Sequence, residues 1–216
     1  MTPVLPLVLV PGLLCSARLY APQIAALWPF GPVTVADHRR DSTMEAIAKR
    51  VLADAPPRFA LAGLSMGGYI AFTIVRLAPE RIVKLARLDT SARPDTAEQT
   101  SGREKFIAMA QAGKLGDVVE TLTPRFLHRN RSKEEGLKRI VREMAADTGA
   151  EAFVRQQKAL MARIDSRPLL TPPEFSKEIC SGISSARLVV VPDCGHLSTI
   201  EKPNAVNAAL AEWLGA

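Results

Sequence analysis

Ser65 stands between two glycines in the segment Gly63-Leu64-Ser65-Met66-Gly67, which has the pattern G-x-S-x-G. The apolar residues before the serine predict a strand and those after it predict a helix, so the serine falls on the turn between them. The glycines leave room for a sharp, strained turn that would present the hydroxyl above a sheet. This arrangement is typical of a nucleophile. The alternative is a glycine-rich packing turn in which the serine is incidental.

A serine nucleophile needs a base, and His196 is the candidate. It follows Cys194-Gly195 after the apolar segment 186–193, which predicts a strand. A histidine just beyond the carboxyl end of a parallel strand can reach a serine presented at the same edge of the sheet. The alternative is a buried histidine bonded to backbone groups. No neighbouring charge would stabilise a thiolate on Cys194, which we interpret as structural.

Two backbone N–H groups are predicted to bind the oxyanion that forms when the serine attacks a carbonyl. The helix after the serine begins near Met66, whose N–H would point toward the reacting oxygen. In the segment "VPGLLCS", Gly12 lets the backbone approach closely and would place the N–H of Leu13 opposite that of Met66. The N–H of Leu14 is the alternative second donor.

Composition indicates one globular domain, because 47% of the 216 residues are hydrophobic and 23% are charged. The formal net charge of +6 would be compatible with a protein that binds nucleic acid. The basic residues are mixed with acidic ones and no stacking aromatic residues accompany them, so no nucleic-acid partner is expected. The apolar start "MTPVLPLVLVPGLLCS" lacks a basic leader, contains prolines and is too short to span a bilayer. We therefore expect a buried first strand and no membrane partner.

The number and spacing of the cysteines and histidines indicate the cellular compartment and whether a metal site is expected. Cys15, Cys180 and Cys194 are odd in number and sit in no paired spacing, which favours a reducing, cytoplasmic compartment. The three histidines show no metal-ligand spacing, so no metal site is expected. A serine mechanism needs no cofactor, and none is predicted.

Short apolar segments alternate with longer segments of helical period, which predicts an α/β fold: a mostly parallel sheet with helices on both faces. We found no repeat or low-complexity segment. Strands are predicted at 5–10, 33–37, 58–65, 81–90 and 186–193, and helices at 16–28, 43–54, 66–79, 172–183 and 203–214.

The alternation stops between about residues 93 and 165, where four helical periods follow one another at 96–111, 114–127, 132–148 and 150–164. This all-helical insertion leaves the sheet at the edge where sites form, so we interpret it as a lid. Residues 1–92 and 166–216 would then form the core, and 93–165 the lid. The alternative is a helical subdomain that only adds core.

Four motifs, in order, resemble the α/β-hydrolase superfamily and in particular its lidded esterase-like branch. They are "VPGLL" at 10–14, "GLSMGG" at 63–68, "LDTSARPD" at 88–95 and "VPDCGHLSTIEKP" at 191–203. The resemblance covers nearly the whole chain and implies the α/β-hydrolase fold with a serine nucleophile. It says little about the substrate.

The chain departs from the superfamily where the third member of the catalytic triad, an acid, usually lies. Such proteins have a strand ending in a Gly-x-x-Asp segment, but here 167–170 runs directly into "TPPE" at 171–174. Asp89, at the end of the predicted strand 81–90, is our substitute, because losing one strand would bring the last strand beside it. The alternative is a turn-forming Asp89 bonded to its own backbone. Asp165, at the lid exit, and Asp193, close in sequence to the histidine, are further candidates.

Together these residues predict a serine hydrolase of carboxylic esters, with lactones and thioesters as further classes, that works through an acyl-enzyme. Phe, Met and Leu in the insertion suggest a small-molecule substrate with an apolar acyl or alcohol group. The alternative is a weakened or non-catalytic small-molecule binding protein that lost its acid with the strand. A sheet edge left open by that loss could be covered in a homodimer.

Overall fold

The computed structural model describes residues 4–166 and 186–215. The predicted helix at 172–183 and the site of the missing strand at 167–174 lie outside these residues. Within them, four parallel strands form one sheet in the order β2-β1-β3-β4. The strands are β1 (Leu7–Val10), β2 (Val33–Val35), β3 (Phe59–Leu64) and β4 (Ile82–Leu88).

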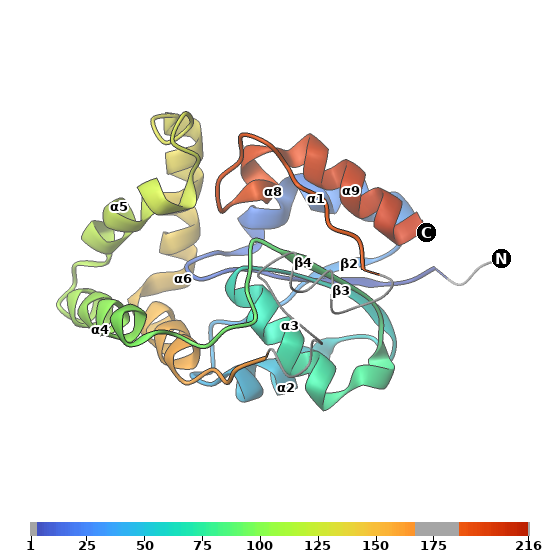
Figure 1. The fold of residues 1–216 in the computed structure, drawn as a ribbon, viewed down its shortest axis with the longest axis horizontal. Helices are drawn as coiled ribbons and strands as arrows, with labels where there is room; N and C mark the ends of the chain where they lie inside the picture. The colour runs from blue at the N-terminus through green and yellow to red at the C-terminus, as the bar shows by residue number, and fades with distance from the viewer. Residues whose placement is uncertain (1–3, 167–185, 216) are drawn as a thin grey trace.

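Helices cover both faces of the sheet, as Figure 1 shows. On one face lie α2 (Met44–Asp54) and α3 (Met66–Leu77). On the other lie α1 (Ala21–Leu27), α8 (Ser198–Glu201) and α9 (Pro203–Gly215). Short 3₁₀ helices occupy Ala17–Tyr20, Trp28–Phe30 and Pro79–Arg81. The predicted fold class is confirmed.

The strand β1 explains why both faces are covered, because its four residues are all buried and alternate between two cores. Leu7 and Leu9 belong to the core that includes residues of α9, whereas Val8 and Val10 belong to the core under α2 and α3. A strand that is apolar on both faces is stable only between two helical layers. This positions the carboxyl end of β1, and the loop that follows it, beside the end of β3.

The backbone of α3 passes so close to β1 that only glycine fits at Gly67. A side-chain carbon there would overlap the carbonyl oxygen of Val10. Gly67→Ala is therefore expected to lower the free energy of unfolding by about 1–3 kcal/mol, measured by urea denaturation. Gly102→Ala, at a position of α4 (Ala97–Gln111) with open space around it, is the control and should be neutral or slightly stabilising. Equal stability of the two variants would contradict the close-approach argument.

The insertion between the two parts of the core is helical, as predicted. It consists of α4, α5 (Leu115–Phe126) and α6 (Glu135–Met161), which form a lobe beside the sheet in Figure 1. Gly149 has non-helical angles (φ 77°, ψ 163°) and kinks α6 at the junction between the third and fourth expected helices. The insertion fits a lid. Its predicted limits, 93 and 165, stay a prediction.

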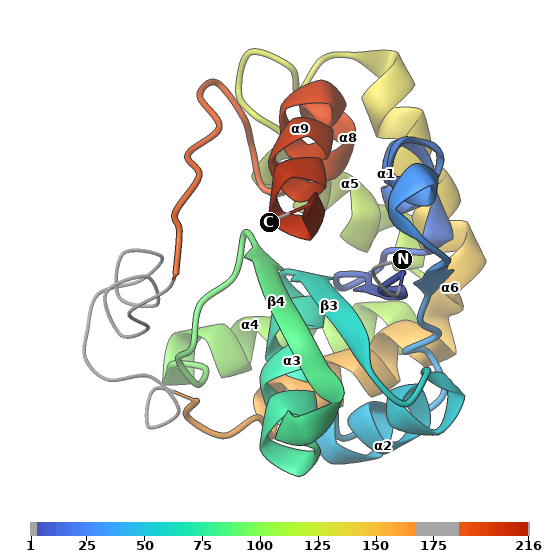
Figure 2. The same ribbon diagram turned by 90° about the vertical axis from the view of Figure 1, so that its right-hand side faces the viewer.

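The predicted strand at 186–193 is wrong. Residues 186–191 have irregular backbone, and the exposed fractions of Leu188, Val189 and Val190 are 38%, 45% and 76%. Figure 2 shows this segment running apart from β4. A strand is stable only when a neighbour completes its hydrogen bonds, and within the described residues β4 pairs with β3 alone. An apolar segment predicts burial, but it does not show whether a neighbouring strand is present to complete its hydrogen bonds.

Candidate functional site

Ser65 occupies a strained turn between the end of β3 and the start of α3. Its φ is 54° and its ψ is −112°, in the left-handed half of backbone space that a non-glycine residue rarely adopts. The end of β4 and the segment just after it hold this conformation through hydrogen bonds to both backbone groups of the residue. The N–H of Ser65 donates to the carbonyl oxygen of Leu88 at 2.9 Å, and the hydroxyl of Thr90 donates to the Ser65 carbonyl oxygen at 2.9 Å. The predicted strained turn at Ser65 is confirmed.

His196 lies against the serine. Its Nε2 is 2.8 Å from the Ser65 hydroxyl oxygen, and its ring stacks on the ring of Phe126, with centroids 6.1 Å apart and an interplanar angle of 22°. Burial lowers the pKa of His196, and the charge of Asp89 opposes this shift by raising it. The imidazole is thus neutral at neutral pH and has a nitrogen placed to accept the serine proton. The structure brings these two predicted residues together.

Asp89 follows β4 directly and has a positive φ of 49°. Its Oδ2 accepts a hydrogen bond from the hydroxyl of Ser198 at 2.5 Å. Burial raises the pKa of Asp89, and the bonds from Ser198 and the nearby His196 lower it. Within the described chain Asp89 forms no direct hydrogen bond with the imidazole and acts on it through space. The structure therefore places Asp89 beside the histidine loop, and its role as the acid stays a prediction.

The loop after β1 is held by two residues that sequence reasoning missed. The N–H of Leu14 donates to Oε1 of Gln156, on α6, at 3.1 Å. Nε2 of His38 lies 2.9 Å from the carbonyl oxygen of Gly12 and 3.1 Å from Nε2 of Gln156. Burial lowers the pKa of His38 to about 4, so its ring is neutral. No motif connects these residues, because 118 positions separate His38 from Gln156.

These contacts bear on the choice of oxyanion donors. The N–H of Leu14, the alternative second donor, is engaged by Gln156. Met66 is the first residue of α3, so its N–H has no acceptor within the helix. Gly12 lies close to the serine, since a side-chain carbon there would be 3.4 Å from the β-carbon of Ser65. Leu13 and Met66 stay our predicted oxyanion donors.

The remaining candidates do not join the site. Asp193 lies in an exposed turn with a φ of 50°, and within the described chain neither it nor Asp165 forms a hydrogen bond with His196. Burial, with the charges of Glu201 and Asp89, raises the pKa of Cys194 to about 11. Cys194 is therefore a thiol at neutral pH, as expected of a structural cysteine.

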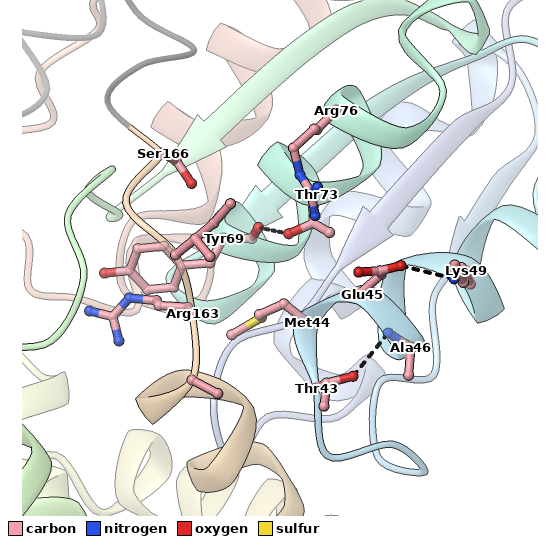
Figure 3. A pocket seen from close by; sticks show the side chains of 12 residues that line it. Thr43, Met44, Glu45, Ala46, Lys49, Tyr69, Thr73, Arg76, Arg163 and Ser166 are labelled. Carbon is pink, nitrogen blue, oxygen red and sulfur yellow. Dashed lines mark hydrogen bonds and ion pairs between the residues drawn. The ribbon is translucent and has the colours of Figure 1, made fainter.

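A cavity of about 420 Å³ lies between α2, α3 and the chain that leaves α6, and neither Ser65, Asp89 nor His196 lines it (Figure 3). Several of its polar side chains are paired with one another or with neighbouring residues. The guanidinium of Arg163 lies 4.4 Å from the ring centre of Tyr69 and bonds to Asp95 at 2.5 Å. We assign it no part in the chemistry.

The described residues contain no group of three or more His, Cys, Asp or Glu side chains placed to hold a metal ion. Among the helices of residues 4–166 and 186–215, none has the length and apolar character needed to cross a membrane.

Comparison with known proteins decides the family. Residues 7–209 match the model of the alpha/beta hydrolase family. The protein belongs to this family. The matched range includes Ser65, the helical insertion and His196.

Proteins similar to this alpha/beta hydrolase include two esterases and one protein named as a bromoperoxidase. A thermophilic esterase from Thermogutta terrifontis is 27% identical and has a TM-score of 0.86, over 97% of this chain and 89% of its own. The pimeloyl-[acyl-carrier protein] methyl ester esterase of Klebsiella pneumoniae is 27% identical over 56% of this chain and 50% of its own length. The protein named "Putative non-heme bromoperoxidase BpoC", from Mycobacterium tuberculosis, is 26% identical over 74% of this chain and 68% of its own.

Proposed function

We propose that the protein is a serine hydrolase of carboxylic esters. The observation that carries this proposal is the 2.8 Å contact between Nε2 of His196 and the hydroxyl of Ser65, on a turn with positive φ. A neutral imidazole at this distance can take the serine proton as the oxygen attacks. The esterase from Thermogutta terrifontis supports the substrate class, because it is similar over nearly the whole chain.

The proposed reaction has two halves. Ser65 attacks the ester carbonyl while His196 takes its proton, and the N–H groups of Leu13 and Met66 hold the negative oxygen. The histidine then returns the proton to the departing alcohol, which leaves an acyl group on the serine. Water, activated by the same imidazole, releases the acid and restores the enzyme. Lactones and thioesters fit this sequence, because they present the same carbonyl and a comparable leaving group.

The test combines labelling with turnover. The protein is incubated with a fluorophosphonate probe, and hydrolysis of p-nitrophenyl acetate and butyrate is followed in parallel, before a wider panel of esters, lactones and thioesters. Stoichiometric labelling at Ser65 with turnover supports the hydrolase. Absence of both would favour the weakened or non-catalytic binding protein. That alternative also agrees with the lack, within the described residues, of a direct hydrogen bond between Asp89 and the imidazole.

The pH dependence follows from the state of His196. Only the neutral imidazole accepts the serine proton, and burial holds the pKa of His196 below its ordinary value of 6.5. We therefore expect kcat/KM for p-nitrophenyl butyrate to be constant near pH 7 and to fall as the pH drops through a midpoint below 6.5. A midpoint above 6.5, in a profile from pH 4 to 8, would contradict this assignment.

A further inference from the structure

The loop that carries His196 lacks the support of a sheet strand within the described chain. Residues 186–191, which lead into it, are irregular and include the exposed Val190. Even so, the imidazole lies 2.8 Å from the serine hydroxyl. A productive geometry requires the ring to be held closely, so other contacts must fix this loop.

Glu201, at the end of α8, supplies the first of these contacts. It is buried, with 2% of its surface exposed. Its Oε1 accepts a hydrogen bond from the N–H of Gly195 at 3.0 Å, next to the histidine. Its Oε2 accepts one from the N–H of His128 at 2.8 Å, just beyond the end of α5. One carboxylate thus joins the histidine loop to the lid.

The end of α5 makes two further contacts with the same loop. The N–H of Leu197 donates to the carbonyl oxygen of Phe126 at 3.1 Å, and the ring of Phe126 stacks on that of His196. The fit is close, because a side-chain carbon at Gly195 would overlap both Oε1 of Glu201 and the N–H of His128. Residues on both sides of the histidine are therefore bonded to α5 or to Glu201.

A buried carboxylate is costly to desolvate, and hydrogen bonds from two backbone N–H groups offset that cost. Such a group stabilises a fold less efficiently than an apolar side chain of the same volume, but it fixes direction. In this protein the carboxylate of Glu201 fixes the orientation of the loop that carries His196.

We propose that Glu201 is a positioning residue for His196, and that it acts by joining the histidine loop to the end of the lid helix α5 in place of a sheet strand. The inference rests on the proposed hydrolase function and adds a role for the lid within it. The lid then contributes to catalysis as a fixed support for the base.

The main test is Glu201→Gln. A glutamine has one acceptor oxygen, so one of the two N–H groups would face its NH₂ group. The rate of fluorophosphonate labelling and kcat for p-nitrophenyl butyrate should each fall on the order of tenfold, with little change in KM. The acid limb of the pH profile should stay in place, because Glu201 bonds the backbone and leaves the charge environment of the ring to Asp89. The exposed Glu104, changed to Gln, is the matched control.

A second pair of variants tests the lid side of the bond. His128→Pro removes the N–H that donates to Glu201, whereas His128→Ala keeps it and loses only the side chain. Labelling of His128→Pro should be several-fold slower than that of His128→Ala. Similar rates in this pair, or a Glu201→Gln protein that labels like the Glu104→Gln control, would overturn the proposal.

Amide hydrogen exchange separates this inference from the proposed function, because it needs no chemistry. In Glu201→Gln, exchange should quicken at 193–199 and at 126–130 while the amides of β3 and α3 stay protected. If the wild-type protein neither labels nor turns over esters, the hydrolase proposal fails, and the exchange result alone decides whether Glu201 anchors the loop. Unchanged exchange at both segments would refute the anchoring itself.

Discussion

Ser65→Ala is expected to abolish hydrolysis of p-nitrophenyl butyrate and labelling by a fluorophosphonate, with a loss in kcat on the order of 10⁵- to 10⁶-fold. The hydroxyl is the atom that would bond to the acyl group, and within the described residues it is the hydroxyl that lies 2.8 Å from Nε2 of His196. Alanine keeps the β-carbon, so the strained backbone with φ 54° experiences the same crowding as before. Stability should therefore change little.

The measurement pairs steady-state kinetics with thermal unfolding. Ser101→Ala, on the exposed surface of α4, is the matched control and should keep wild-type kinetics. Turnover by Ser65→Ala at the wild-type rate would mean that the activity resides elsewhere in the molecule. A large drop in melting temperature would show that the hydroxyl contributes to packing and would weaken the inference from lost activity.

The parts of the site that sequence predicted are those with a local cause. The glycines around Ser65 require a sharp turn, and the turn requires a strand before it and a helix after it. The predicted helix at 43–54 also has a local cause, because Thr43 precedes its periodic segment and accepts a hydrogen bond from the N–H of Ala46 as its N-cap. Pro203 likewise begins α9. Such features depend on neighbours within a few residues, which the sequence displays directly.

The contacts that the sequence did not predict are hydrogen bonds between residues far apart along the chain. Gln156 reaches Leu14 across 142 positions, and Glu201 reaches His128 across 73. A glutamine or glutamate within a helix is ordinarily exposed, so nothing local distinguishes these two. The error at 186–193 has the same origin, because whether an apolar run becomes a strand depends on a partner elsewhere in the chain.

The contact between Ser198 and Asp89 is another one that the sequence did not predict, because 109 positions separate the two residues. The sequence argument for Asp89 relied on a last strand lying beside β4, and that strand is not formed in the described residues. The structure instead connects Asp89 to the histidine loop through the hydroxyl of Ser198, two residues beyond His196. Asp89 thus lies near the histidine loop, as predicted, but a side-chain hydrogen bond makes the connection and strand pairing does not.

Asp89→Asn is expected to lower kcat by about 10²- to 10⁴-fold with a smaller change in KM. When His196 takes the serine proton it becomes an imidazolium, and the nearby carboxylate stabilises that charge at the moment it forms. In a free enzyme such contacts are often long and shorten only in the complex with substrate, so the absence of a direct bond to the ring is compatible with this role. Asparagine keeps the shape and can still accept the Ser198 hydrogen bond, but it carries no charge.

The pH profile distinguishes the charge from the hydrogen bond. The charge of Asp89 raises the pKa of His196, so its removal should lower that pKa further and move the acid limb of kcat/KM to lower pH. Ser198→Ala removes the 2.5 Å hydrogen bond and keeps the carboxylate, so it should lose less activity than Asp89→Asn and leave the charge near the ring. An Asp89→Asn protein within a few-fold of wild type, with an unmoved acid limb, would remove Asp89 from the proposed triad. His196 would then act without an orienting carboxylate, and a weakened enzyme would become the better description, because a base lacking its acid partner loses on the order of 10⁴-fold in turnover.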